Sequence, residues 1–315
     1  MTSPGTARLL WSLAEPFHAL TYFAAEATAA FEEAGLRGFW SGYFAGRAAP
    51  LGAVGAEVVT ATFVNFAPEF VARRVPAVWD QATPAAALDA RLAGVDAAVH
   101  RVLGAGWTAS DEVRELRDLA ATAAAAVDLP GRPLAAANTG VAVPDEPHLA
   151  LWQLLTTLRE HRGDGHTAAL VDREVDGVQG HVLAVAAGRA DRAWLQKARG
   201  WDDEAWDAGA ARLARRGWLA HGELTAQGLA VVTAIEADTD RLALGPWQAL
   251  GSRGCDRFAE LIRPVRRAVV GRRRVAGRQP DRRARTRLIS ARSAHSGDSA
   301  PGKPRVCRSR GGGLR

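Results

Sequence analysis

The densest run of side chains that can do chemistry lies between residues 159 and 166. It contains Arg159, Glu160, His161, Arg162, Asp164 and His166. Imidazoles act as acids, bases or ligands near neutral pH, and a carboxylate such as Asp164 can orient one. Gly163 and Gly165 predict that a helix ends here, with His161 and His166 on either side of a Gly-Asp-Gly turn.

Three interpretations of this cluster stay open. Its groups can pair with one another at a charged helix end, bind a small molecule or anion, or perform acid–base or metal-assisted catalysis. Two imidazoles and a carboxylate are a common ligand set, but the spacing of His161 and His166 is not a recognised metal motif. We therefore expect no metal site, with these two histidines as the weak candidates. The sequence identifies no cofactor and leaves open whether the protein is an enzyme.

A second group of polar side chains lies near the amino terminus. Glu15 and His18 share one helical face. If the two halves of the chain pack about a pseudo-two-fold axis, this pair meets the cluster at Arg159–His161. The candidate catalytic residues are then Glu15, His18, His161 and His166. The walls of a cavity at this interface would come from Trp11, Tyr22, Tyr43, Trp152 and nearby Arg47. The alternative is that these aromatic residues belong to an ordinary core.

Glu57 lies in the apolar stretch 52–63, where a carboxylate needs a partner. We expect Arg47 to be that partner, and the alternative is a solvent-facing Glu57. The predicted ligand-binding residues are Arg47, Glu57, Arg159, Arg162, Asp164, Tyr22, Tyr43 and Trp152.

Start and stop signals outline helices in residues 1–128, which we predict as a helical, winged-helix-like unit. The helices run from Thr6 to about Glu33, from Thr83-Pro84 to about Leu103, and from Ser110 to Val127. Residues 129–147 contain four Pro and little periodicity, so they are predicted to form a linker.

Residues 148–262 are predicted to form a winged helix-turn-helix unit. A helix follows Asp202, two short strands lie within 217–224, and a long helix follows Thr225. The halves also match at an offset of 142, where residues 34–48 resemble 176–190 and Thr83 pairs with Thr225. The predicted fold is mainly α, with tandem winged-helix-like units from an internal duplication, as a monomeric pseudo-dimer or a homodimer.

Composition excludes several classes of protein. A chain of 315 residues with two Cys has no disulfide framework or cysteine-based zinc site. No stretch approaches the roughly 20 apolar residues of a membrane span, and no signal-peptide core is present. We expect a cytoplasmic protein.

Charge is distributed unevenly along the chain. Residues 263–315 contain 16 Arg and one Lys against two Asp, a net of +15, which leaves −9 for residues 1–262 because the whole chain carries +6. The segment 263–315 has no Trp, Tyr or Phe and is predicted to be a disordered tail. It is a nucleic-acid-binding arm, a solvated terminus, or the product of a reading frame that has slipped.

Longer phrases carry a family resemblance. The stretch "LARRGWLAHGELTAQG" (213–228) resembles the recognition helix and wing of MarR-type regulators. Together with "EPFHALTYFAAEA" (15–27), "GYFAGRAAPLGAVGAEVVTATFVNFAPE" (42–69) and "LREHRGDGH" (158–166), it resembles the actinobacterial SalK-like helix-turn-helix family over nearly all of residues 1–262. This resemblance implies a winged-helix fold and no established activity, and the tail has no counterpart in it.

The predicted recognition helix opens with Asp202, Asp203, Glu204 and Asp207. Such carboxylates repel a polyanion, so DNA is a disfavoured partner. We expect a small-molecule-binding or ligand-responsive, regulator-like protein with weak or lost DNA binding. The alternative is an enzyme of natural-product metabolism that uses a His/Glu site between the halves.

Overall fold

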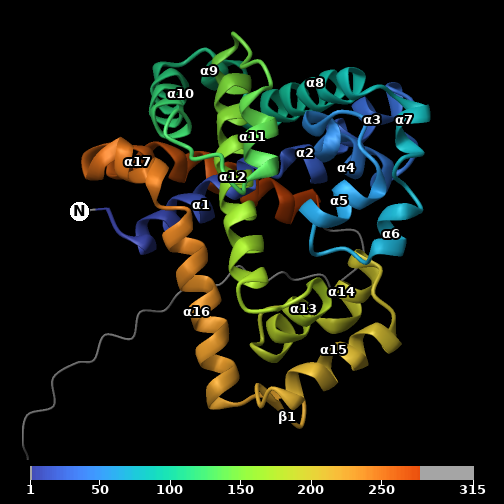
Figure 1. The fold of residues 1–315 in the computed structure, drawn as a ribbon. Helices are drawn as coiled ribbons and strands as arrows, with labels where there is room; N and C mark the ends of the chain where they lie inside the picture. The colour runs from blue at the N-terminus through green and yellow to red at the C-terminus, as the bar shows by residue number, and fades with distance from the viewer. Residues whose placement is uncertain (1, 277–315) are drawn as a thin grey trace, which may run out of the picture.

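The computed structural model describes residues 2–276, with side chains through residue 271, and it consists mainly of helices (Figure 1). One two-stranded sheet is found among these residues. The predicted mainly α class is therefore confirmed. The prediction of a disordered tail falls for the most part on residues 277–315, outside the described part of the chain. In the described part, none of the helices is both long and apolar enough to cross a membrane.

The first half of the chain contains helices and, among its described residues, no strand. Its elements are α1 (Pro4–His18), α2 (Leu20–Phe23), α3 (Ala25–Glu33), α4 (Phe39–Ala48), the 3-10 turn η1 (Ala49–Leu51), α5 (Ala56–Thr62), α6 (Pro68–Ala72), α7 (Val78–Gln81), α8 (Pro84–Leu103), α9 (Ala105–Thr108), α10 (Asp111–Ala124) and α11 (Pro133–Thr139).

The second half contains longer helices and the small sheet. Its elements are α12 (Pro147–Val171), α13 (Gly177–Ala186), α14 (Arg192–Arg199), α15 (Asp203–Arg215), β1 (Leu219–Ala220), β2 (Glu223–Leu224), α16 (Ala226–Leu242) and α17 (Gly245–Ala276). The strands pair antiparallel, with Leu219 opposite Leu224. Helix α15, the two strands and α16 follow one another in the order that the sequence predicts.

Helices begin at the capping residues that the sequence predicts. The Ser3 hydroxyl accepts a hydrogen bond from the Thr6 amide and so caps α1. The Thr83 and Thr225 hydroxyls cap α8 and α16 in the same way. Each cap satisfies an amide that the first helical turn leaves without a partner.

The prediction of a single helix from Thr6 to about Glu33 is wrong, because this segment forms the three helices α1, α2 and α3. Pro16 lacks an amide hydrogen and lies in the last turn of α1. Ala24 takes an extended backbone between α2 and α3. The third helix then packs along α8.

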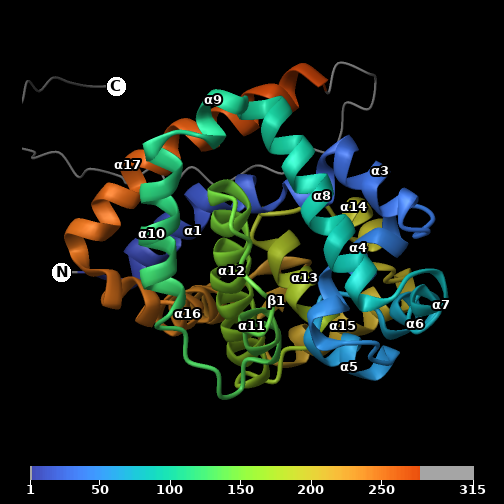
Figure 2. The same cartoon turned by 90° about the horizontal axis from the view of Figure 1, so that it is seen from above.

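The helix stop predicted at Gly163 and Gly165 is also wrong, because α12 continues through both to Val171. A glycine inside a helix costs only about 1 kcal/mol relative to alanine, and the burial of α12 outweighs that cost. The second glycine is needed for packing, since a Cβ on Gly165 would lie 3.1 Å from Leu242 Cβ. Seen from above, α12 runs through the middle of the molecule (Figure 2).

The linker predicted at residues 129–147 is wrong as well, since it contains α11, which packs against α12. Leu134 and Ala135 are fully buried there. Pro133 marks the first turn of α11 and not a break between domains.

The body of the protein extends beyond the predicted end at residue 262. Helix α17 has a kink at Gly251 and then continues across Arg263 to Ala276. Val265 and Val269 are buried in the same core cluster as α1, α10 and α12. Residues 263–276 add six Arg and no acid, so the net charge of residues 1–276 is −3 instead of −9.

The two halves share an order of helices but not the hairpin. Helices α4 and α13, and then α8 and α16, fall at the positions that the predicted repeat aligns. In the first half, α7 ends at Gln81 and Thr83 already caps α8, which leaves no room for a hairpin. The hairpin that a winged-helix unit requires is therefore found, among the described residues, in the second half only, and the winged-helix assignment of that half stays a prediction.

The carboxy-terminal helices of the halves are exchanged. Helix α17 packs against α1 of the first half, and α10 of the first half packs against α12 of the second. Helices α10 and α17 also contact each other, as expected for elements on either side of a pseudo-two-fold axis. The predicted duplication agrees with this packing and stays a prediction.

We predict that Val269→Ala lowers the free energy of unfolding by about 2 kcal/mol, because it removes two buried methyl groups and leaves a cavity. Chemical denaturation of the full chain measures the change. Arg267→Ala, at an exposed position of the same helix, is the control and is expected to have little effect. Equal stability of the two variants would contradict the placement of α17 in the core.

Candidate functional site

A buried ion pair joins the two halves at the centre of the molecule. Arg47 of α4 donates to Glu160 of α12 through two hydrogen bonds, Nε to Oε1 and Nη2 to Oε2, both 3.0 Å. Arg159 Nη1 donates to the same Oε1 at 2.8 Å. Glu160 is 1% exposed, so water does not screen these interactions.

The charges around Glu160 shift its pKa strongly. Burial alone would raise the pKa of Glu160, but Arg159 and Arg47 outweigh burial and lower it to about 2. Glu160 is therefore ionised at neutral pH. Its two arginine neighbours keep their charge as well, since the attraction of Glu160 raises the pKa of both against the effect of burial.

A second buried arginine adds to the positive charge. Arg91 of α8 is 3% exposed and donates to Gly46 O at 3.1 Å and to Gln153 Oε1 at 2.9 Å. Burial lowers its pKa to about 10, which leaves it charged at neutral pH. Neutral groups accept these hydrogen bonds. Arg47, Arg91 and Arg159 thus give this interior an excess of cations.

A small cavity lies next to this network, between α1, α12 and the start of α17. Its volume is about 20 Å³, which is room for one water molecule. Its lining residues are Trp11, Ala14, Glu15, His18, Leu155, Leu158, Arg159, His161, Arg162, Ala243, Pro246 and Trp247. Both halves of the chain therefore contribute to its walls.

Glu15 and His18 bring unpartnered polar atoms to this cavity. Glu15 Oε2 and both ring nitrogens of His18 are buried without a hydrogen-bond partner among the described residues. Glu15 Oε2 lies 4.0 Å from His18 Nδ1 and 4.0 Å from Arg159 Nε. Burial raises the pKa of Glu15 and holds the pKa of His18 well below its usual value. Such atoms are costly unless a water or a ligand satisfies them.

The predicted aromatic residues surround His18. Trp152 is fully buried, stacks on the His18 ring at a centroid distance of 5.9 Å, and donates its indole N–H to His18 O at 3.0 Å. Tyr22 lies edge-on to the same imidazole and contacts Tyr43 at 4.9 Å. Trp152 is thus packed beneath the imidazole and does not line the cavity. Tyr22 and Tyr43 line a separate void of about 10 Å³.

The structure separates the two histidines that were weak metal candidates. His161 Nε2 lies 2.6 Å from Asp128 Oδ1, and His166 Nδ1 lies 3.0 Å from Thr239 Oγ1. Because α12 continues through this region, they do not flank a turn. Asp164 orients neither imidazole, since its Oδ2 accepts a hydrogen bond from the Ala135 amide at 2.9 Å.

Two further pairings differ from the sequence predictions. Glu57 lies exposed in the first turn of α5, so the expected pair with Arg47 is wrong and the solvent-facing alternative is right. Arg162 forms an ion pair with Asp240 of α16 at 2.8 Å and lies over the Trp11 ring at 4.8 Å. It closes one side of the cavity.

Sequence reasoning missed Arg91. The signal was present, because Ala87, Gly94 and Val95 recur at helical spacing around it and place Arg91 on the buried face of α8. A charged residue on an apolar face marks a buried interaction.

The turn between α14 and α15 is held against the first half. The turn residue Gly200 has a φ of +79°, and a Cβ on it would lie 2.4 Å from the side chain of Phe70. Arg199 O accepts a hydrogen bond from the Ala67 amide at 2.9 Å, and Trp201 donates to Asn65 O at 3.1 Å. The amino end of α15 is therefore fixed next to α6.

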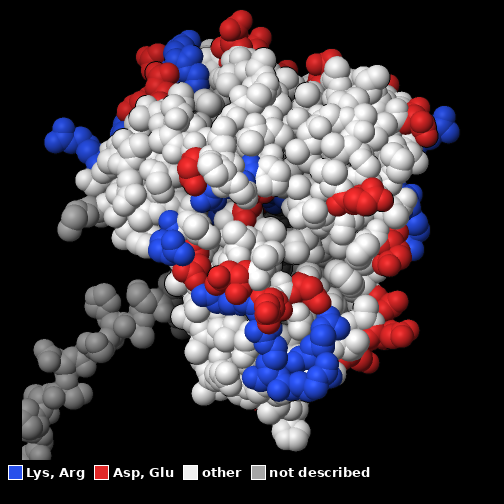
Figure 3. Space-filling view, in the orientation of Figure 1, with Lys and Arg blue, Asp and Glu red and all other residues white. Residues whose placement is uncertain are grey.

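The surface around α15 carries both signs of charge. Asp203 and Asp207 pair with Arg192, while Asp202 caps the helix. Basic side chains gather on the lower part of the face in Figure 3, with acidic ones beside them. A groove of about 780 Å³ includes the basic residues Arg212, Arg215 and Arg216 at the carboxyl end of α15.

Comparison with known proteins identifies one family. The sequence of residues 7–276 matches a helix-turn-helix family. No curated protein and no solved structure matches the chain. The matched segment ends where the described part of α17 ends, which agrees with a body that includes residues 263–276.

We predict that Glu160→Gln lowers the free energy of unfolding by about 3 kcal/mol at pH 7 because the buried Arg47 and the half-buried Arg159 lose their counter-charge. The pKa of Glu160 is lower in the folded than in the unfolded protein. Its stabilisation is therefore complete above the unfolded pKa and is lost as pH falls through the folded value of about 2.

Denaturation curves of both proteins between pH 7 and pH 2 measure this difference, which should shrink in the acid range. The exposed Glu57→Gln is the control and should follow the original protein at every pH. A gap between the Glu160 variant and the original protein that stays constant down to pH 2 would contradict the assignment.

Proposed function

The chain belongs to this helix-turn-helix family, and from that premise we propose a small-molecule-binding, regulator-like protein with weak or lost binding of duplex DNA. The observation that carries the proposal is the cavity between the halves, where Glu15 and His18 hold buried atoms without partners. No hydrogen bond within the described protein satisfies these atoms. A bound ligand that replaces water in the cavity would do so.

The charge of the interior indicates the class of ligand. The buried Arg47 and Arg91 and the half-buried Arg159 surround one ionised carboxylate, Glu160, while burial raises the pKa of Glu15 and lowers that of His18. A small anion would compensate the excess, with Arg159 as a cationic side chain in the lining of the cavity. The lining by Trp11 and Trp247 suits an anion with an aromatic or apolar part.

The size of the cavity has a consequence for such a ligand. A space of about 20 Å³ holds one water, so any larger molecule must move the walls apart. The walls belong to α1 of one half and to α12 and α17 of the other. Binding would therefore change how the halves pack, which is the coupling that a ligand-responsive protein requires.

Weak duplex binding follows from the surroundings of α15. A recognition helix normally places its amino end in the major groove. Here that end carries Asp202, Asp203 and Glu204 and is docked beside α6, with Glu69 lining the groove between them. Carboxylates on both sides repel phosphates, and the basic Arg212 and Arg215 lie at the other end of the helix.

We predict that benzoate binds the full chain and quenches tryptophan fluorescence, whereas benzamide, its neutral analogue, binds at least tenfold more weakly. Arg159→Gln should weaken benzoate binding by about tenfold or more, since it removes one charge-assisted contact of about 1.4 kcal/mol. Arg117→Gln, in an exposed pair with Asp118, is the control. Equal binding of benzoate and benzamide would sink the anion assignment.

We also predict weak, strongly salt-dependent binding of duplex DNA by a chain that ends at Ala276. Fluorescence anisotropy with a labelled duplex of random sequence measures the affinity. Replacing Asp202, Asp203 and Glu204 by their amides should raise it about tenfold, because three repulsive charges disappear. Tight binding at physiological salt before the replacement would overturn this part of the proposal.

An enzyme remains the second candidate, and one observation favours it. Glu15 Oε2 and His18 Nδ1 lie 4.0 Å apart at one cavity, and a carboxyl group and an imidazole are the side chains that most often transfer protons in enzymes. The two candidates differ in the fate of the bound molecule. A ligand leaves the protein unchanged, whereas a substrate is converted and Glu15→Gln and His18→Gln each abolish its conversion.

A further inference from the structure

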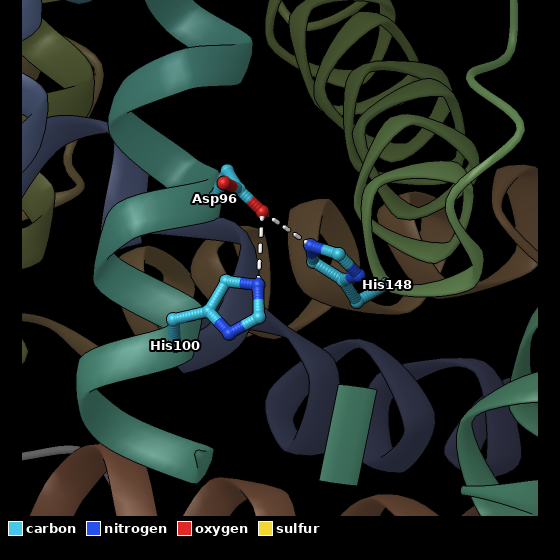
Figure 4. Close-up of side chains that lie close together, drawn as sticks. All are labelled: Asp96, His100 and His148. Atoms are coloured by element: carbon cyan, nitrogen blue, oxygen red, sulfur yellow. Dashed lines mark hydrogen bonds and ion pairs between the residues drawn. The ribbon is translucent and has the colours of Figure 1, made fainter. Parts of the chain in front are cut away.

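A second cluster of ligand-type side chains lies away from the cavity, where α8 of the first half meets the start of α12 (Figure 4). Asp96 and His100 are one turn apart on α8, and His148 lies in the first turn of α12. His148 Nε2 is 2.6 Å and His100 Nε2 is 3.4 Å from the same atom, Asp96 Oδ1. One carboxylate oxygen thus lies between two imidazoles.

We propose that Asp96, His100 and His148 bind a divalent transition-metal ion of the zinc type. One ligand atom from each residue lies within 4.8 Å of the others. Zinc bonds to imidazole nitrogen and carboxylate oxygen are roughly 2.0–2.2 Å long, so a tetrahedral ion holds its ligand atoms about 3.3 Å apart. The two distances to Asp96 Oδ1, 2.6 Å and 3.4 Å, lie on either side of that value.

The types and placing of the ligands also fit such an ion. Two imidazoles and one carboxylate are ligands of borderline ions such as zinc, cobalt and iron(II), in contrast to the all-oxygen sites of magnesium and calcium. The spacing of Asp96 and His100 is the i,i+4 geometry in which two side chains on one helical face chelate one ion. The third ligand comes from another helix, so the site depends on the fold.

The exposure of the cluster leaves a coordination position open. The side chains of Asp96 and His100 are each 43% exposed, while that of His148 is 5% exposed. A metal would therefore be anchored on the protein side and reachable by water on the other, as in zinc sites with three protein ligands. Because the ligands come from both halves, the ion would tie α8 to α12.

Without an ion, the short contact between His148 and Asp96 needs a proton on Nε2. An ion bonds only to a ring nitrogen that carries no proton, so protons compete with the metal for these imidazoles and affinity should fall as the pH is lowered.

The test is a Co²⁺ titration of the full chain, followed by visible absorption and by isothermal calorimetry at pH 7.5 and pH 5.5. We expect one equivalent to bind at pH 7.5 with the absorption of a four- or five-coordinate ion, without a sulfur-to-metal charge-transfer band. That band would assign the ion to Cys255 or Cys307 and overturn the proposal. Binding should weaken at least tenfold at pH 5.5.

His100→Ala should weaken Co²⁺ binding at least tenfold without unfolding the protein, because His100 is an exposed side chain. The matched control is His221→Asn in the β-hairpin turn, where asparagine tolerates the positive φ of 52°. Zn²⁺ should raise the Tm of the original protein and of the control but not that of His100→Ala. Unchanged Co²⁺ affinity in His100→Ala, or no saturable binding at all, would overturn the proposal.

Discussion

The bidentate pair between Arg47 and Glu160 is the contact on which the centre of the structure depends. Two charges can be buried only if each finds its partner, and these partners come from different halves of the chain. A displacement of α4 relative to α12 would leave an arginine and a carboxylate in an apolar interior. The pair therefore fixes the position of one half on the other. The same packing of α4 and α8 on α12 positions Arg159 and Arg91. These two arginines give the interior its positive charge.

Local signals predicted much of the fold. Ser3, Thr83 and Thr225 start helices because side-chain caps act within three residues, and the hairpin around His221 is likewise a local pattern. The errors have tertiary causes. Gly165 looks like a helix stop, but its missing side chain makes room for Leu242. Val265 and Val269 lie among arginines, so the sequence placed them in the tail. The packing of α17 on α1 shows that they are core residues.

For the candidate site as well, the sequence predicted that some residues lie together and could not predict how others pair. Residue type and helical spacing singled out Glu15, His18 and Arg159, and the structure brings them to one cavity. Spacing could not show which carboxylate Arg47 would meet, because Glu160 lies 113 residues away along the chain. The same holds for Asp96 and His148, which are 52 residues apart and carry no motif. Pairings between distant helices depend on the packing, and the sequence leaves them open.

The exchange of carboxy-terminal helices also constrains the order in which the two halves can fold during synthesis. During synthesis the first half emerges with α1 already complete, yet the helix that covers it, α17, is the last described element of the chain. The apolar face of α1 cannot be covered by α17 until that helix has been synthesised. Contacts between residues so far apart in the sequence slow folding, and until they form, an aggregation-prone hydrophobic surface stays exposed. We expect the halves to fold together and not one after the other.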